Sequence, residues 1–449
     1  MDTVVRTGFE PVRVAPADVH TCLARHILVD GLPLVYDYRR SQGSYLVDET
    51  TGRRYIDLFS FYSSAPLGHN HPKMRDPEFV AKIAEIALIN PSNSDVYTVE
   101  MAEFVETLAK YVIPPEFPHL FFVAGGAPAV ENALKVAFDW KVRKNLARGK
   151  GEKGTKVIHF REAFHGRLGY TLSLTNTYDP RKYKYFPKFD WPRVENPKLR
   201  FPITAEVIAE VEEAEERSVA QIEAALDRYQ DDIAAIIIEP VQCEGGDNHF
   251  RPEFFAKLRK IADEREVMLI YDEIQTGMGM TGTWWMAEQL GVMPDIIVFG
   301  KKLQVCGIAV SRRVDEVEDN VFVEPSRISS TWGGNLVDMV RGQRYIQVIL
   351  EDNLLENASR QGKFLLQQLE GLREEGFAIS NIRGRGLLVA FDLPDHELRD
   401  LVHHEALKAG VILLKCGEKG IRLRPFMDVN SDVLQEAIDI LRTILPRSK

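Results

Sequence analysis

Short apolar runs rich in β-branched residues alternate with longer amphipathic stretches through the middle of the chain. The apolar runs are HLFFVAGG (119–126), KVIHF (156–160), AAIIIEP (234–240), VMLIYDE (267–273) and DIIVFG (295–300). Runs of this length and composition are typical of strands buried on both faces. Between them lie helix-like patterns such as 129–145 and 250–266. Alternation of this kind over roughly 200 residues predicts an α/β domain with a largely parallel sheet.

The pattern changes near residue 336, where a long helical stretch is followed by short strand-like runs at GRGLL, VILLK and IRLRPF. A chain of 449 residues also exceeds one ordinary hydrophobic core. We therefore expect a large domain over 70–335 and a smaller α+β domain over 336–449. An N-terminal segment, 1–69, is expected to contribute to the small domain and to the entrance of the active site.

Composition excludes several classes of function. A formal charge of -10 argues against a nucleic-acid partner, because such binding draws on clustered Lys and Arg. No run approaches the roughly 20 apolar residues of a membrane span, and MDTVVRTGFEPVRVAPADVH lacks the pattern of a signal peptide. The four cysteines are scattered without CxxC spacing, which is typical of reduced thiols. We expect a cytoplasmic protein.

Two motifs suggest sites that their context does not support. GHNHP (68–72) holds a His-x-His without a third ligand at usable spacing, so we expect a structural turn and no metal. GMGMTG (277–282) is a literal GxGxxG, but a dinucleotide site needs it directly after a strand and an acid at the end of the next strand. Here EIQT intervenes, and Asp295 precedes the next strand. We therefore expect no dinucleotide site.

Polar residues stand where α/β sheets bind ligands, outside the carboxyl ends of the strands. Gly126 and Ala127 lie between a strand and a helix, where small residues let backbone N–H groups approach a phosphate. Asp272 and Glu239 each end an apolar run and need a partner when buried, which for either could be a structural arginine. Lys301 follows a further strand.

A phosphate-binding turn, a buried aspartate and a strand-end lysine together are what pyridoxal 5'-phosphate requires. The lysine attaches the cofactor covalently, and the aspartate keeps the ring nitrogen protonated so that the ring accepts electrons. Phe164, in AFHGR, is the candidate aromatic cover for the ring. The set is much more specific than any of its members, and it predicts a pyridoxal-phosphate enzyme.

The order of motifs resembles one family. GGAPAVENALK, AFHGR, IIEPVQCEGGD, YDEIQTGMGMTGTWW, PDIIVFGKKLQ, STWGGN and IRLRP, in this order, resemble the class III aminotransferases of fold type I, from about residue 30 to the C-terminus. Segments such as FPKFDWPR, GDNHFRPEFF and GKKLQVCGI are most similar to the members that move the ε-amino group of L-lysine to 2-oxoglutarate. The resemblance implies 2-aminoadipate 6-semialdehyde and L-glutamate as products. Pro128 replaces the Leu more usual in the phosphate turn.

The resemblance also implies roles for residues at the cofactor. The class pattern places the covalent lysine directly after the glycine that ends the strand, which selects Lys301. Side chains in an extended segment alternate, so Lys302 would be structural or face solvent. Gln275 would hydrogen-bond the phenolic oxygen of the cofactor. Thr331 would contact the phosphate from the neighbouring subunit, which implies a homodimer with shared active sites.

For the substrates, the resemblance assigns Arg422 to the α-carboxylate of glutamate or 2-oxoglutarate and Arg167 to the distal carboxylate. Arg424 has the same chemistry and is the alternative to Arg422. Glu244 would pair with that arginine when lysine binds and swing away when glutamate binds, so it joins the catalytic set with Lys301 and Asp272. Tyr62 occupies a substrate-pocket position that varies across the family.

Two other functions stay open at this point. Another ω-amine could be the donor, such as ornithine, acetylornithine, 4-aminobutyrate or a diamine. The chain could also be a non-catalytic protein that keeps the fold, although intact Lys301, Asp272 and Gln275 argue against this.

Overall fold

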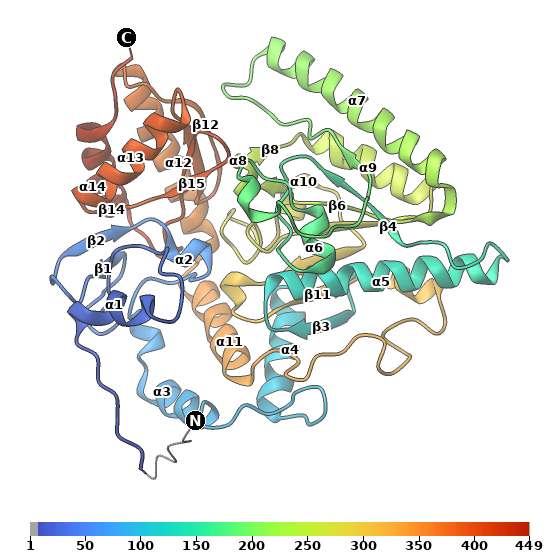
Figure 1. Ribbon diagram of the computed structural model, residues 1–449, viewed down its shortest axis with the longest axis horizontal. Coiled ribbons are helices and arrows are strands. Elements are labelled where there is room, and N and C mark those ends of the chain that lie inside the picture. The colour runs from blue at the N-terminus through green and yellow to red at the C-terminus, as the bar shows by residue number, and fades with distance from the viewer. Residues whose placement is uncertain (1–7, 449) are drawn as a thin grey trace, which may run out of the picture.

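A seven-stranded sheet forms the centre of the molecule (Figure 1), and the computed structural model describes residues 8–448. The strand order is β3-β11-β10-β9-β6-β4-β5. These strands are His119–Val123 (β3), Cys306–Val310 (β11), Ile296–Phe299 (β10), Met268–Asp272 (β9), Ile233–Ile238 (β6), Lys156–Phe160 (β4) and Arg193–Val194 (β5). β11 is antiparallel to both neighbours, and the other five from β10 to β5 are parallel. The expected largely parallel sheet is confirmed.

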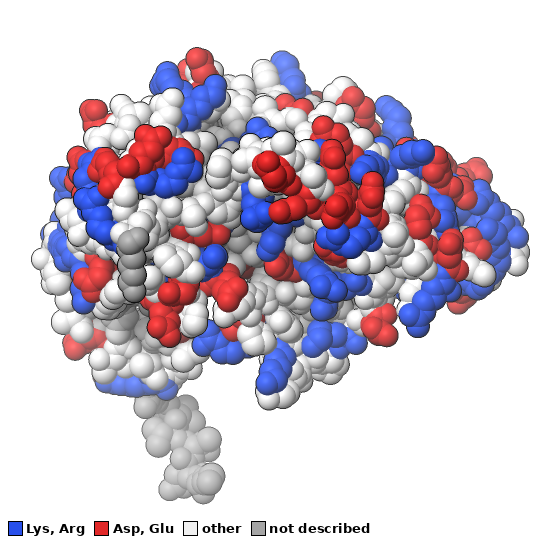
Figure 2. Space-filling view, turned by 90° about the horizontal axis from the view of Figure 1, so that it is seen from above, with Lys and Arg blue, Asp and Glu red and all other residues white. Residues whose placement is uncertain are grey.

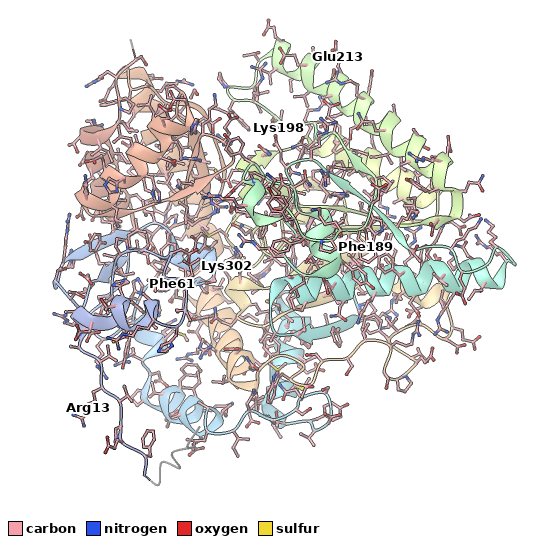
Figure 3. All side chains as sticks on the ribbon, in the orientation of Figure 1. Arg13, Phe61, Phe189, Lys198, Glu213 and Lys302 are labelled. Atoms are coloured by element: carbon pink, nitrogen blue, oxygen red, sulfur yellow. The ribbon has the colours of Figure 1, made fainter. Side chains whose placement is uncertain are left out.

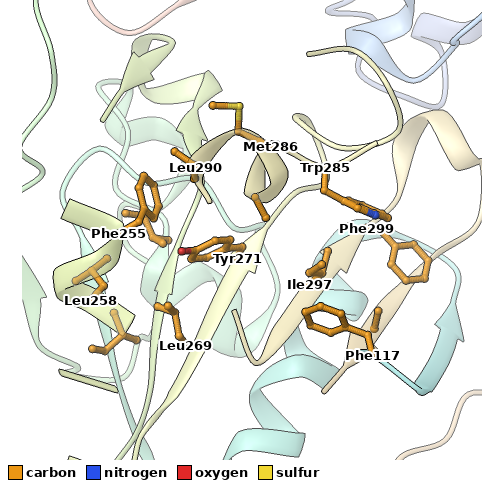
Figure 4. Close-up of a cluster of buried hydrophobic side chains, with 14 of the residues drawn as sticks. Phe117, Phe255, Leu258, Leu269, Tyr271, Trp285, Met286, Leu290, Ile297 and Phe299 are labelled. Atoms are coloured by element: carbon orange, nitrogen blue, oxygen red, sulfur yellow. The ribbon is translucent and has the colours of Figure 1, made fainter. Parts of the chain in front are cut away.

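Helices cover both faces of this sheet, so that its central strands are buried throughout. They are Val99–Tyr111 (α4), Gly126–Ala147 (α5), Ala205–Tyr229 (α7), Pro252–Glu264 (α9) and Leu336–Glu351 (α11). Alternate strand residues enter opposite cores: Ile270 and Val298 pack with α5, whereas Leu269 and Tyr271 belong to the cluster that holds α4, α7, α9 and α11. Figure 4 shows Leu269 and Tyr271 in the second cluster, beside Phe255 of α9.

A second group of elements combines the two ends of the chain. Its strands are Ser380–Arg385 (β12), Leu388–Asp392 (β13), Gly420–Leu423 (β16), Leu414–Cys416 (β15), Tyr45–Val47 (β1), Arg54–Asp57 (β2) and Val411–Ile412 (β14). Its helices are Leu354–Glu374 (α12), His396–Ala409 (α13) and Ser431–Ile444 (α14). β2 pairs in parallel with β14, which brings the blue and red parts of Figure 1 side by side. The division at residues 69 and 335 stays a prediction, and residues 1–7 of its first segment lie outside the described residues.

Shorter helices and strands lie between these elements. They are Val19–Ala24 (α1), Ser60–Ser63 (α2), Pro77–Ile86 (α3), Gly169–Leu174 (α6), Cys243–Gly246 (α8), Met286–Leu290 (α10), Val241–Gln242 (β7) and Asn248–His249 (β8). Within residues 8–448, no helix has the length and apolar character to cross a membrane. Figure 2 shows basic and acidic side chains interspersed over one face.

The parallel strands direct the candidate residues to one edge of the sheet. Asp272 ends β9, and Lys301 follows the adjacent strand β10. Glu239 follows β6, which is paired with β9 on its other side. Because the carboxyl ends of neighbouring parallel strands lie at the same edge, the topology places these three residues at one edge of the sheet.

Candidate active site

Both lysines of the pair at the end of β10 point inward. Lys301 begins a short 3-10 helix, Lys301–Leu303, with φ of 48°, and its Nζ donates to the carbonyl of Tyr62 over 2.9 Å. Lys302 is buried, and its Nζ donates to the carbonyl of Gln275 over 2.7 Å. Burial and the nearby charge of Arg422 lower the pKa of Lys301 to about 8. Burial and the charge of Lys301 lower the pKa of Lys302 to about 7.

These positions correct part of the sequence interpretation. The segment at Lys301 is a tight turn and not an extended strand, so alternation does not separate the two lysines. Lys302 does not face solvent, because its amine is held by backbone carbonyls inside the protein. Of the two roles expected for Lys302, structural or solvent-facing, its contacts fit the structural one.

A left-handed turn faces the lysines. The four residues Ser60–Ser63 have φ between 38° and 64°, a region that costs non-glycine residues about 1–2 kcal/mol each. The turn directs the carbonyl of Tyr62 to Lys301, and that of Ser64, just after it, accepts from Gln304. In Figure 3, Phe61 and Lys302 lie where the N-terminal segment meets the large sheet. Strain concentrated beside candidate catalytic groups is typical of functional sites.

Asp272 is held by a histidine that the sequence interpretation missed. His165 Nδ1 lies 2.9 Å from Asp272 Oδ2, and the two side chains are 0% and 5% exposed. Since a carboxylate only accepts, Nδ1 carries the proton in this bond. Asp272 Oδ1 accepts from the backbone N–H of Ile274 over 3.2 Å. The position of His165 beside Phe164 in AFHGR was the signal available in the sequence.

Glu239 supports Phe164. Its Oε1 accepts the backbone N–H of Phe164 over 2.8 Å. Burial raises the pKa of Glu239 well above its usual range, and the negative charge of Asp272 raises it further. Neither Glu239 nor Asp272 pairs with an arginine among residues 8–448, so the arginine alternative is wrong for both.

The start of α5 presents backbone donors. Gly125, with φ of 106°, precedes the helix, and Gly126 and Ala127 are its first two residues. First-turn N–H groups have no acceptor within their own helix, and Pro128 in the third position has no N–H to offer. A side chain at Gly126 would come within 3.0 Å of Ile274, which shows how closely this turn packs beside β9.

Glu244, in α8, bridges two cations. Its Oε2 accepts from Arg422 Nη2 and its Oε1 accepts from Lys182 Nζ. Burial alone would raise the pKa of Glu244, but the charges of Arg422 and Lys182 bring it below its ordinary value. The sequence interpretation anticipated the contact with Arg422 and missed Lys182.

Arg422 and Arg424 lie two residues apart but have different surroundings. Both Nη atoms of Arg424 are engaged, by Asp247 and by the carbonyls of Leu423 and Val389. Arg422 is buried, yet its Nε and Nη1 have no hydrogen-bond partner in the described part of the chain. Arg424 also leaves its Nε unpaired in this range, but Arg422 leaves two donors open. Because buried donors are costly to leave unpaired, Arg422 has the greater capacity for an added anion.

Other predicted site residues are less enclosed. Phe164 lies near Glu244, since Nζ of Lys182, which pairs with Glu244, is 5.8 Å from the centroid of the Phe164 ring. Tyr62 is 58% exposed. Arg167 is exposed and forms no ion pair with any residue from 8 to 448. Thr331 is exposed too, and its carbonyl accepts from Ser92 and Ser94. Within the described range, no hydrogen bond joins Arg167 or Thr331 to Lys301, Asp272 or Glu244.

Comparison with known proteins decides the family, because the sequence model "Aminotransferase class-III" matches residues 28–445. The chain belongs to the class III aminotransferases. It is 51% identical over 434 residues to the L-lysine-epsilon aminotransferase of Mycobacterium tuberculosis, with 96% of each chain covered. It is 45% identical to that of Streptomyces clavuligerus, with 94% and 93% covered.

A solved structure agrees with these relatives. The lysine aminotransferase from M. tuberculosis superposes with a TM-score of 0.93 at 50% identity, and the match covers 96% of this chain and 99% of that one. The expected fold type I architecture and aminotransferase activity are confirmed, and the cofactor is pyridoxal phosphate.

The residues of this chain fit that cofactor. The open N–H groups at Gly126 and Ala127 suit its phosphate. The buried carboxylate of Asp272, held in a fixed orientation by His165, suits a protonated ring nitrogen. Lys301 supplies an amine whose pKa is lowered to about 8, which favours the neutral form needed for covalent attachment.

Proposed function

We propose that this aminotransferase moves the ε-amino group of L-lysine to 2-oxoglutarate, giving 2-aminoadipate 6-semialdehyde and L-glutamate. The observation that carries the proposal is Arg422, a buried arginine with free donors whose charge is matched by Glu244. When Glu244 moves away from Arg422, the arginine binds the α-carboxylate of a substrate. When Glu244 stays paired with Arg422, the site accepts a substrate that has no carboxylate at that end. The likeness to L-lysine-epsilon aminotransferases supports lysine as the donor.

Lys301 is the proposed covalent anchor and proton carrier. When bound, pyridoxal phosphate supplies an aldehyde for the substrate amine and a ring that withdraws electrons from the adjoining carbon. Lys301 would hold the cofactor and, once free, its Nζ would move a proton to and from the substrate carbon that carries the amine. Its lowered pKa leaves part of the amine unprotonated near neutral pH, as a general base requires.

Asp272, Phe164 and Gln275 are proposed to control the ring. Asp272 faces the ring nitrogen and holds its proton, while His165 fixes the carboxylate by hydrogen bonding. Phe164, anchored through its backbone by Glu239, covers one face. Gln275 donates to the phenolic oxygen. Gly126 and Ala127 bind the phosphate through their backbone N–H groups.

Two carboxylate-binding residues allow substrates of different length to share the site. Lysine enters with its ε-amine first, while Glu244 stays on Arg422 and the carboxylate of lysine binds Arg167. With glutamate or 2-oxoglutarate, Glu244 leaves and Arg422 grips the α-carboxylate through its planar guanidinium. Tyr62 lines the pocket through its exposed ring. Arg167 forms no ion pair within residues 8–448, so it is available to bind the carboxylate of lysine.

We further propose a cytoplasmic homodimer with shared active sites. Thr331 of one subunit would contact the phosphate bound by the other. Its exposure, with a backbone fixed by Ser92 and Ser94, suits a contact made across an interface.

A nitrogen-labelling experiment tests the reaction. Purified enzyme is given 2-oxoglutarate with lysine carrying heavy nitrogen at either the ε or the α position, and glutamate is analysed by mass spectrometry. We expect label in glutamate from ε-labelled lysine alone. The same assay with ornithine, acetylornithine, 4-aminobutyrate and a diamine ranks the donors. Label from the α position, or a faster alternative donor, would contradict the proposal.

A further inference from the structure

Glu244 has a second cationic partner besides Arg422. Lys182 ends a short 3-10 helix, Pro180–Lys182, and its Nζ donates to Glu244 Oε1 while Arg422 occupies Oε2. The Lys182 and Glu244 side chains are 18% and 22% exposed, so this ion pair is largely shielded from water. The two oxygens of one carboxylate are thus divided between two cations from distant parts of the chain.

The orientation of Lys182 differs from that of the other basic residues in its loop. Arg181 pairs with Asp179, Lys184 lies 4.8 Å from the ring of Tyr185, and Lys188 donates to backbone carbonyls of the loop itself. Lys182 instead turns towards the cofactor side, where its ammonium also lies 5.8 Å from the ring centroid of Phe164. It contacts two candidate site residues at once.

We propose that Lys182 is a positioning residue for Glu244, which holds one oxygen of the carboxylate while the other releases Arg422. This inference rests on the proposed function, in which an incoming α-carboxylate replaces Glu244 at Arg422. A largely buried carboxylate that loses its partner is destabilised, and it also repels the arriving carboxylate. The retained contact with Lys182 offsets both effects, so that Glu244 pivots about Oε1 and stays paired.

Loss of Lys182 should therefore affect the two substrates unequally. Without Lys182, Glu244 pairs with Arg422 alone. Its displacement from Arg422 then leaves the Glu244 carboxylate unpaired in the site. Binding of a dicarboxylate requires that displacement, whereas lysine binds with the Glu244–Arg422 pair intact. The glutamate half-reaction should lose more than the lysine half-reaction.

Glutarate is a suitable probe, because it has the two carboxylates of 2-oxoglutarate but no carbonyl or amine to react. Calorimetric titration of the holoenzyme measures its Kd. Lys182→Met should raise that Kd by about tenfold, as expected for loss of one partly shielded ion pair. Lys182→Arg should restore most of the affinity. Lys184→Met, which removes a neighbouring exposed charge, is the matched control and should leave the Kd unchanged.

A double-mutant cycle shows whether Lys182 acts through Glu244. In a Glu244→Gln background, Lys182→Met should change the glutarate Kd by less than about twofold, because the neutral side chain no longer needs the cation. A tenfold effect that persists there would show direct binding of the dicarboxylate to Lys182 and overturn the positioning role. An unchanged Kd in the single variant would overturn it as well. If the unsubstituted enzyme does not bind glutarate, the proposal that 2-oxoglutarate is the acceptor is wrong instead.

Discussion

His165 donates through Nδ1 to Asp272 Oδ2 over 2.9 Å, at a place where both side chains are almost completely buried. The bond joins the loop after β4 to the end of β9, two strands away in the sheet. Together with the backbone N–H of Ile274, which donates to Oδ1, this bond sets the direction of the carboxylate proposed to face the ring nitrogen. The backbone N–H of the adjacent Phe164 donates to Glu239 Oε1.

Substitutions at this pair should separate charge from orientation. Asp272→Asn removes the charge that keeps the ring nitrogen protonated, and we expect turnover to fall on the order of 10²-fold or more, with weaker cofactor binding. His165→Ala removes the hydrogen bond and the buried ring but keeps the charge of Asp272, so a loss of about tenfold is expected, with partial recovery in His165→Asn. Steady-state rates and cofactor titration measure both. Near-normal turnover in Asp272→Asn would mean that another residue faces the ring.

Covalent attachment distinguishes the two lysines. Reduction of the holoenzyme with borohydride, followed by peptide mass mapping, should place the label on Lys301. Lys301→Ala should still bind the cofactor through the remaining contacts but turn over at least about 10³-fold more slowly, because its proton carrier is missing. Lys302→Met is the matched control and should keep the label on Lys301. Label on Lys302 would reverse the assignment.

Cofactor attachment should depend on pH according to the lowered pKa of Lys301. A neutral amine is required, and a group with a pKa of about 8 gains its neutral form as pH rises through 8, well below the usual 10.5 for lysine. The attachment rate of apoenzyme, followed by absorbance, should rise about tenfold per pH unit below 8 and level off above it. Arg422→Met removes a nearby positive charge and should move this midpoint upward. A midpoint near 10 in the unsubstituted protein would contradict the burial of Lys301.

Replacement of Arg422, in β16, and of Arg424, just after that strand, should have different effects. Arg424→Met leaves Asp247 buried without its partner, and we expect a loss of about 3–5 kcal/mol in the free energy of unfolding measured in urea. Arg422→Met should weaken glutarate binding on the order of 10²-fold while changing stability less, since two of its donors are already unpaired. The reverse pattern would make Arg424 the carboxylate-binding residue.

Removal of the Glu244 carboxylate should uncouple the two substrates. Glu244→Ala leaves Arg422 without its competitor, so the glutamate half-reaction should be unchanged or faster. Lysine should lose part of its preference for ε-amine attack, because Arg422 is then free to bind its α-carboxylate. Single-turnover absorbance with each donor, combined with product identification, measures both effects. Equal losses in the two half-reactions would leave Glu244 a general structural residue.

Local patterns in the sequence were enough to predict the strands and turns that carry the site. Its β-branched runs and amphipathic stretches have local periodicities, and these fixed the parallel strands and the edge at which Asp272, Glu239 and Lys301 meet. The glycine-rich turn before α5 was visible for the same reason, since its geometry depends on neighbouring residues. These features needed no knowledge of distant contacts.

The pairing of side chains could be seen only in the folded molecule. In the run IRLRPF, the spacing of two predicts that Arg422 and Arg424 share one face of a strand, so no sequence pattern could separate them. Their difference arises from Glu244 and Asp247, which lie 178 and 177 residues away in sequence. His165 and Lys182 were likewise missed because their partners are distant in sequence. The contacts of Lys301 and Lys302 with the carbonyls of Tyr62 and Ser63 were missed for the same reason, since each pair is 239 residues apart in sequence.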